Sequence, residues 1–236
     1  MKTARNNPVF EGRDELKYVS HSIYFEHLLS WLKTRFPGDF LYPSGTVRSI
    51  YFDTLNQKYL NEKINSDYLK SKIRLRWYSE SDDSPEPENY YIEIKNRMGR
   101  RTLKSRHHFK DTSGKICNLP LEHDFFAEIV SAVKKAFPEL APYSILPMAV
   151  IKYERYRFVD MIHNLRLSLD TRICAERVNR MFFSKFSPFP LPQSVFEIKG
   201  DVSTLPDHLQ FITGMGYKKE SFSKYQACLE HIEHGS

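Results

Sequence analysis

Charged and apolar residues alternate along six short segments of this 236-residue chain, and this alternation constrains the fold more than any other feature. In the segment YYIEIKNR, residues 90–97, Ile92 and Ile94 fall on one face of an extended strand. Glu93 and Lys95 fall on the opposite face. Alternation with aromatic and β-branched residues predicts a β-strand. What remains open at this point is whether the charged face meets bulk water or the inside of a binding site.

The same period of two residues recurs along the chain, and it predicts eight strands. These are residues 14–20, 48–54, 71–79, 89–97, 102–109, 149–159, 165–173 and 194–200. Most of them come in neighbouring pairs, which favours antiparallel hairpins. Apolar residues at helical spacing predict helices over residues 21–36, 121–137, 204–216 and 224–233.

The polar faces of these strands are almost all charged and rich in arginine, whereas a solvated strand face usually mixes serine, threonine and lysine. Arg74 and Arg76 share one such face, and Arg155 and Arg157 share another. An ordinary solvated sheet is the simpler interpretation of any single strand. Taken together, the strands favour charged faces that turn inward while amphipathic helices cover the apolar faces. The sequence therefore predicts an α+β fold: an eight-stranded antiparallel β-barrel that forms a tunnel, with helices packed outside.

The composition is compatible with a single domain over residues 1–236 that binds an anion. Hydrophobic residues make up 41% of the chain, the formal net charge is +6, and the sequence pI is about 9.1. A cavity lined by so many cations needs anions, so a polyanionic ligand is the natural complement. Phosphate-binding glycine loops of the G-x-x-x-x-G-K-[ST] and G-x-G-x-x-G types are absent from the sequence, so side chains would bind the phosphates.

Cysteine usage and hydropathy indicate the compartment. The three cysteines, Cys117, Cys174 and Cys228, are far apart and form no C-x-x-C motif, which is typical of reduced thiols. The N-terminal residues lack the apolar run of a secretory signal, and no stretch approaches the roughly 20 apolar residues of a membrane helix. We expect a soluble, cytoplasmic protein without a membrane segment.

Eight short motifs carry a family resemblance. In chain order they are SIYFDT, KIRLRWY, IEIKNR, LKSR, YERYRF, LRLSLDT, FEIKG and FSKY. Together they resemble the catalytic domain of the vacuolar transporter chaperone (VTC) polyphosphate polymerases, a branch of the CYTH-like triphosphate tunnel metalloenzymes. The match runs from about Arg13 to Tyr225. The resemblance implies a tunnel that binds triphosphate or polyphosphate together with Mg²⁺ or Mn²⁺.

The resemblance also implies roles for individual residues. The phosphate-binding residues are Lys17, Arg74, Arg76, Lys95, Lys104, Arg155, Arg166 and Lys199. Glu197 resembles the metal-binding carboxylate, and Glu197, Lys224 and Lys95 form the implied catalytic set. Strand alternation rather than motif identity supports Lys199, Glu93 and Arg106. Arg13 stands where related branches have the first glutamate of Glu-x-Glu-x-Lys, which favours the VTC branch.

The function that these features predict is metal-dependent phosphoryl transfer, with polyphosphate synthesis from ATP as the main hypothesis. An inorganic or nucleoside triphosphatase would use the same residues with water as the attacking group. A non-catalytic module that binds polyphosphate or nucleic acid is the third alternative, although we do not expect nucleic acid as the partner. The sequence HIEH at residues 231–234 is a short tail segment that we interpret as solvated rather than metal-binding.

Overall fold

The computed structural model describes residues 9–10, 14–82, 84–99 and 101–234. Its strands are β1 (Val9–Phe10), β2 (Asp14–His21), β3 (Ser44–Thr54), β4 (Leu69–Ser79), β5 (Asn89–Met98), β6 (Arg101–Lys110), β7 (Ile145–Asp160), β8 (Leu165–Val178), β9 (Gln193–Gly200) and β10 (Lys218–Lys219). Its helices are α1 (Phe25–Arg35), α2 (Lys58–Ile64), α3 (Lys115–Asn118), α4 (Phe125–Ala136), α5 (Phe211–Gly214) and α6 (Lys224–His234), with 3₁₀ turns η1 (Ser22–Tyr24), η2 (Pro138–Leu140) and η3 (Asp207–Leu209). The eight predicted strands correspond to β2 to β9.

Within the described residues, all ten strands join one antiparallel sheet in the order β1-β6-β5-β4-β3-β7-β8-β9-β2-β10. The α+β class is therefore confirmed. Strands β6 and β2 do not pair with each other. The two-residue strand β1 pairs with the free edge of β6, and the two-residue strand β10 pairs with the free edge of β2. The prediction of a closed eight-stranded barrel is wrong, since the ring of hydrogen bonds is interrupted and the sheet is open.

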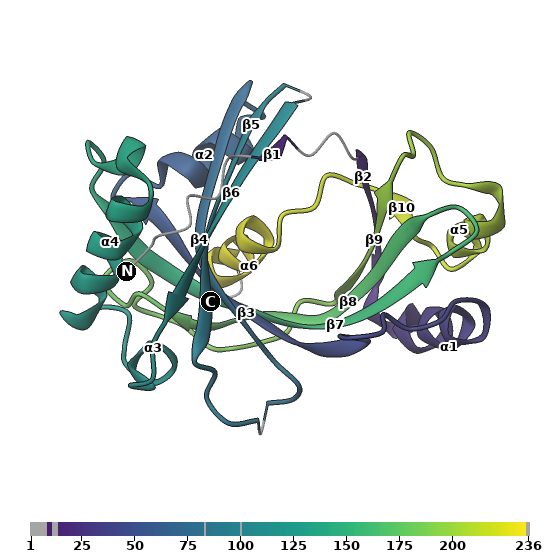
Figure 1. The fold of residues 1–236 in the computed structure, drawn as a ribbon, viewed down its shortest axis with the longest axis horizontal. Helices are drawn as coiled ribbons and strands as arrows, with labels where there is room; N and C mark the ends of the chain where they lie inside the picture. The colour runs from purple at the N-terminus through teal and green to yellow at the C-terminus, as the bar shows by residue number, and fades with distance from the viewer. Residues whose placement is uncertain (1–8, 11–13, 83, 100, 235–236) are drawn as a thin grey trace.

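The open sheet is bent into a deep trough (Figure 1). Strands β4, β5 and β6 form one wall, β9 and β2 form the other, and β3, β7 and β8 run between them as the floor. Only four residue steps separate Phe10 in β1 from Asp14 in β2, so the two rims lie within about 14 Å at this point. Register shifts in β3 and β7 fall in the floor, where such irregularities increase strand bending.

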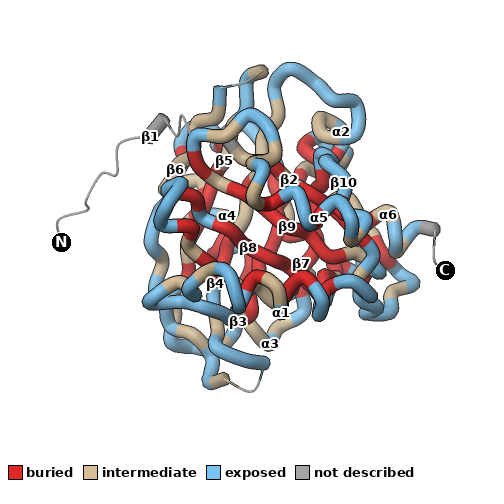
Figure 2. The backbone as a smooth tube through the Cα atoms, turned by 90° about the vertical axis from the view of Figure 1, so that its right-hand side faces the viewer, coloured by how far each residue is buried: buried red, intermediate tan, exposed pale blue. Residues whose placement is uncertain are grey.

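Two apolar cores cover the convex face of the sheet. Ile73 and Ile92 belong to a cluster with Ile129 of α4, and Phe196 belongs to a second cluster with Leu28 of α1. Figure 2 shows buried residues running along the central strands, whereas the connecting loops are exposed. Each fully buried side chain of this size contributes roughly 1.5–3 kcal/mol to folding. The apolar faces of the strands are therefore covered by helices, as the alternation predicts.

Helix α6 lies on the concave face of the sheet, inside the trough (Figure 1). Its Cys228 and Leu229 join a core cluster with Tyr51 of β3 and Tyr153 of β7. The ring of Tyr225 stacks on that of Tyr51 with 4.8 Å between centroids and 10° between planes. The prediction that every helix packs outside is wrong for α6, because part of the concave face is apolar and needs a cover. The charged part of that face stays open.

The helix predicted over residues 204–216 is broken into η3 and the short α5. Pro206 precedes η3, and Gly216 adopts a left-handed backbone with φ of +73°, which ends the segment. In the described part of the chain, the helices are too short and too polar to cross a membrane.

Candidate functional site

The charged part of the concave face surrounds a cavity of about 530 Å³. Its cationic lining consists of Lys17, Lys72, Arg74, Arg76, Lys95, Arg97, Lys104, Arg155, Arg166, Lys199, Lys219 and Lys224. Its acidic lining consists of Glu15, Glu197 and Glu220. Twelve cations therefore face three glutamates in a partly desolvated space, where like charges repel more strongly than in water. Such a lining is stabilised by bound anions.

Strand register brings opposite charges together on the cavity wall. Lys17 of β2 lies directly opposite Glu197 of β9, and Arg74 of β4 lies opposite Glu93 of β5. Side chains at directly opposite positions of an antiparallel pair are close enough to interact. The pairs therefore follow from alternation once the register is known.

Glu197 is the centre of a cluster of cations. Its Oε1 atom lies 3.4 Å from Lys224 Nζ and 3.8 Å from Lys17 Nζ. Its Oε2 atom lies 3.2 Å from Arg155 Nη2 and 3.7 Å from Lys199 Nζ. Burial raises the pKa of Glu197, but the surrounding positive charges outweigh burial and hold this pKa well below its usual value. Glu197 is therefore ionised at neutral pH.

Asp170 of β8 lies beneath this cluster and has no solvent exposure. Arg155 donates Nε–H and Nη2–H to its two oxygens at 2.6 and 2.7 Å, and Lys224 Nζ lies 2.6 Å from Oδ2. Burial lowers the pKa of Lys224, but Asp170 and Glu197 outweigh burial and raise it above the usual value. Lys224 is also the first residue of α6, where the helix dipole disfavours a cation. Asp170 and Glu197 offset that cost.

Arg74 and Arg76 reach into the cavity from β4. Arg74 holds Glu93 through Nε and Nη2, at 2.8 and 2.7 Å from Oε2, and Arg106 Nε lies 3.5 Å from the other oxygen. Burial raises the pKa of Glu93, but Arg74 and Arg76 lower it to about 2. Arg76 donates Nε–H to the neutral Ser49 hydroxyl at 2.9 Å. Since Ser49 carries no charge, the charge of Arg76 can serve an anion in the cavity.

Tyr51 and Lys72 make the charge of the cavity sensitive to pH. Arg74 Nη1 lies 3.4 Å from Tyr51 Oη, and Lys72 Nζ lies 5.6 Å from the centroid of the tyrosine ring. Burial raises the pKa of Tyr51, but Arg74, Lys72 and Arg76 lower it to about 7. Burial lowers the pKa of Lys72 to about 8. Both groups therefore change charge close to neutral pH.

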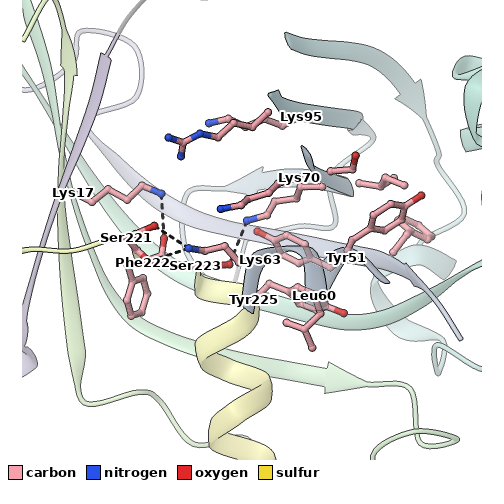
Figure 3. A pocket seen from close by; sticks show the side chains of 16 residues that line it. Lys17, Tyr51, Leu60, Lys63, Lys70, Lys95, Ser221, Phe222, Ser223 and Tyr225 are labelled. Carbon is pink, nitrogen blue, oxygen red and sulfur yellow. Dashed lines mark hydrogen bonds between the residues drawn. The ribbon is translucent and has the colours of Figure 1, made fainter. Parts of the chain in front are cut away.

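A smaller recess of about 130 Å³ adjoins the cavity next to α2 (Figure 3). It shares Lys17 and Lys95 with the cavity and adds Lys63 and Lys70. Lys17 and Lys63 hydrogen-bond the loop at residues 221–223, which lines both spaces. The cationic surface is therefore longer than the cavity alone.

A family model described as the VTC domain matches residues 12–232. This chain belongs to the VTC domain family. The match spans nearly the whole sequence, and it confirms the resemblance carried by the eight motifs. No curated protein matches this VTC domain.

Two solved structures resemble this VTC domain in fold. A protein of Pyrococcus horikoshii OT3 has a TM-score of 0.50 and 12% sequence identity, over 92% of this chain and 98% of that one. A candidate adenylate cyclase of Bacillus halodurans has the same TM-score of 0.50 and the same identity of 12%, over 90% of this chain and 95% of the other. At this identity the likeness establishes a shared fold.

The structure of this VTC domain brings the residues singled out in the sequence into one place. The cavity lining includes Lys17, Arg74, Arg76, Lys95, Lys104, Arg155, Arg166, Glu197, Lys199 and Lys224. Glu93 is buried against Arg74 with Arg106 beside it, and neither Glu93 nor Arg106 lines the cavity. Arg13 lies outside the described residues.

Three important side chains of the VTC domain were not assigned to the site from the sequence: Asp170, Lys72 and Tyr51. Strand alternation carries a signal for two of them, because Asp170 shares a face with Arg166 and Lys72 shares one with Arg74. Nothing in the sequence separates Tyr51 from an ordinary core tyrosine, since its role depends on the cations that the fold brings around it.

The donor set of the cavity fits a hard divalent cation that binds together with phosphate. Glu15 and Glu197 share two lysine neighbours: Lys17 lies 3.6 and 3.8 Å from them, and Lys199 lies 3.8 and 3.7 Å from them. Mg²⁺ commonly takes one or two carboxylates and completes its shell with water and substrate phosphates. The carboxylates alone are too few for a complete site, but a phosphate chain would supply further oxygens and attract the lysines toward itself.

Proposed function

We propose that this VTC domain, taken as a single domain over residues 1–236, binds triphosphate and polyphosphate in the cavity and catalyses metal-dependent phosphoryl transfer. Polyphosphate synthesis from ATP is the reaction that we favour. The observation that carries the proposal is the lining of twelve cations against three glutamates. Arginine and lysine side chains suit phosphate because they donate charge-assisted hydrogen bonds to its oxygens.

Binding rests on the cations of both walls and the floor. In this proposal the phosphate ligands are Lys17, Arg74, Arg76, Lys95, Lys104, Arg155, Arg166 and Lys199. Arg155 already gives two N–H groups to Asp170, so it has fewer donors left for phosphate than Arg76, which hydrogen-bonds a neutral hydroxyl. Arg76 is therefore the cleaner probe of phosphate binding.

Catalysis rests on charge neutralisation and positioning, which are the main requirements of phosphoryl transfer. Lys224 sits at the N-terminus of α6, where the helix dipole and its ammonium both favour negative charge on a transferred phosphate. Lys95 lies 3.3 Å from Glu15 on the opposite wall and would complete the set with Glu197. Mg²⁺ or Mn²⁺ held by Glu197 would supply Lewis-acid stabilisation of the same developing charge.

The lysine-rich recess favours a polymer over water as the acceptor. Beyond the cavity it adds Lys63 and Lys70, which extend the cationic path past Lys17 and Lys95. A triphosphatase needs room for one short substrate, whereas a polymerase must also hold a growing chain. The longer cationic surface therefore supports the polymerase.

Incubation of the protein with ATP and Mn²⁺ or Mg²⁺ tests the proposal. We expect ADP release together with long-chain polyphosphate, read out by gel electrophoresis and by ADP assay. Free phosphate without polymer would indicate a triphosphatase instead of a polymerase. If neither product forms but the protein still binds tripolyphosphate, the domain is a non-catalytic binding module. Glu128→Gln, an exposed change on α4, serves as the control variant.

A further inference from the structure

Two histidines and one aspartate meet on the convex side of the sheet. Asp160 ends β7, His163 follows in the turn to β8, and His208 comes from η3, 45 positions further along the chain. Asp160 Oδ2 lies 2.9 Å from His163 Nδ1 and 2.7 Å from His208 Nε2. The two imidazole rings stack with 4.0 Å between centroids and 9° between planes. Two elements that are distant in sequence thus direct ring nitrogens at the same carboxylate oxygen.

The carboxylate of Asp160 is fixed in this orientation by its other oxygen. Oδ1 accepts the backbone N–H groups of Ile162 and His163 at 3.2 and 3.1 Å. The Asp160 side chain is 3% exposed, whereas those of His163 and His208 are 48% and 29% exposed. The carboxylate of Asp160 is therefore buried and fixed in orientation, whereas both imidazoles are partly exposed to solvent. Metal sites typically hold their ligands through such outer hydrogen bonds.

This cluster is separate from the phosphate cavity. Along β7, Asp160 shares the face of Phe158, which packs in the core with α1, and not the face of Arg155, which lines the cavity. One ligand atom from each of the three residues can be chosen so that all lie within 4.8 Å of one another, and no other described trio of His, Cys, Asp or Glu meets that condition. A small rearrangement would bring these ligand atoms to metal-binding distance.

We propose that Asp160, His163 and His208 form a binding site for a borderline divalent metal ion of the Zn²⁺ class. Two imidazole nitrogens and one carboxylate oxygen are common Zn²⁺ ligands, with water in the fourth position. Mg²⁺ and Mn²⁺ prefer oxygen ligands, so they are poor competitors for this site. Each imidazole must turn a nitrogen lone pair toward the ion, at the position where that nitrogen now hydrogen-bonds Asp160.

The site would link the β7–β8 turn to the segment between β9 and β10. That segment continues through β10 to Glu220, whose N–H donates to the Lys17 carbonyl, and on to Lys224 at the start of α6. A bound ion would therefore fasten the chain that leads into the phosphate cavity without contacting the cavity itself. The alternative is that the same three side chains act only as a hydrogen-bonded cap on the turn. The two interpretations predict different affinities of the protein for metal ions.

Calorimetric titration of the full chain, first treated with a chelator, distinguishes them. We expect one equivalent of Zn²⁺ to bind and to raise Tm, with no comparable effect of Mg²⁺ at this site. His163→Gln and His208→Gln should each weaken that binding by roughly tenfold or more, a loss that even outer-ligand changes can cause. His231→Gln, an exposed change on α6, should retain it. Glu197→Gln in the cavity should retain it as well.

Co²⁺ gives a second readout, because its absorption spectrum reports imidazole coordination directly. If His208→Gln fails to fold, the more exposed His163→Gln decides the question by itself. Equal Zn²⁺ affinity and equal Tm shifts in the wild type, His163→Gln and His208→Gln would overturn the proposal. So would the absence of saturable Zn²⁺ binding by the wild type.

Discussion

The ammonium of Lys224 lies 2.6 Å from the carboxylate of Asp170, which has no solvent exposure. This contact fixes the first residue of α6 at the inner wall of a cavity in which cations outnumber glutamates. Among the described carboxylates, Glu197 would be the one counterion left near the buried charges of Lys224 and Arg155 without Asp170. The Asp170–Lys224 pair therefore links the stability of the protein without ligand to the affinity of the cavity for anions.

Asp170→Asn should destabilise the protein and make it more dependent on an anion. Removing one partner of a buried ion pair costs about 3–5 kcal/mol, because the remaining charge stays buried. We expect that loss in the free energy of unfolding, measured with denaturant. Tripolyphosphate should then raise the Tm of the variant more than that of the wild type. Asp201→Asn, at an exposed position, is the control, and an Asp170→Asn protein as stable as this control would contradict the account.

Arg76→Ala and Arg74→Ala should separate binding from stability. Each should reduce tripolyphosphate affinity by about 1.5–3 kcal/mol per charged hydrogen bond lost. Only Arg74→Ala leaves Glu93 buried without its main partner, so this variant should also lose stability. Titration calorimetry and thermal melts measure the two effects. Arg172→Ala, a highly exposed change, should do neither; equal affinities in all three variants would contradict the assignment.

Glu197→Gln should abolish turnover and spare binding. The amide keeps the shape of the side chain but is a weaker ligand for a divalent cation. Affinity for tripolyphosphate in the absence of metal should hold or rise, because one negative charge has left the cavity. Activity with Mn²⁺ and metal-free calorimetry measure the two effects. An active variant with unchanged metal dependence would show that the metal binds elsewhere.

Tripolyphosphate binding should weaken as pH rises from about 6 to 9, and Tyr51 should cause part of this change. Its pKa of about 7 in the folded protein means that higher pH adds a negative charge to the cavity. Lys72, with a pKa of about 8, loses its positive charge over the same range. Tyr51→Phe should have a flatter pH dependence than the wild type in parallel titrations. Because the ligand titrates identically in both experiments, matching profiles would argue against ionisation of Tyr51.

The same Tyr51 pKa also predicts a change in stability. Its folded value of about 7 lies below the ordinary value of 10.0, so the unfolded chain holds more protons between these two limits. The contribution of Tyr51 to the free energy of unfolding should therefore grow with pH across that window in the absence of ligand. Denaturant titrations of the wild type and Tyr51→Phe at several pH values measure it. A difference between them that does not vary with pH would contradict the prediction.

Strand alternation predicted the strands and their faces, because a period of two residues is local and each charged face is nearly continuous. Ile73 and Phe196 therefore pack on the convex side, while Arg74 and Glu197 lie on the concave side. Closure of the sheet and the position of α6 could not be predicted in this way. Closure depends on whether the edges β6 and β2 meet, and α6 fits inside because apolar floor residues such as Tyr153 need a cover. Neither condition is local in sequence.

The affinities for phosphate, pyrophosphate and tripolyphosphate, measured by calorimetry at matched ionic strength, test the central claim most directly. If the cationic concave face is the binding site for phosphate chains, affinity should increase at each step, because a longer chain contacts more of the arginines and lysines. Thermal shifts should increase in the same order. Equal affinities for the three anions would contradict the account, because they would mean that a single phosphate group, and not a chain of phosphates, is recognised.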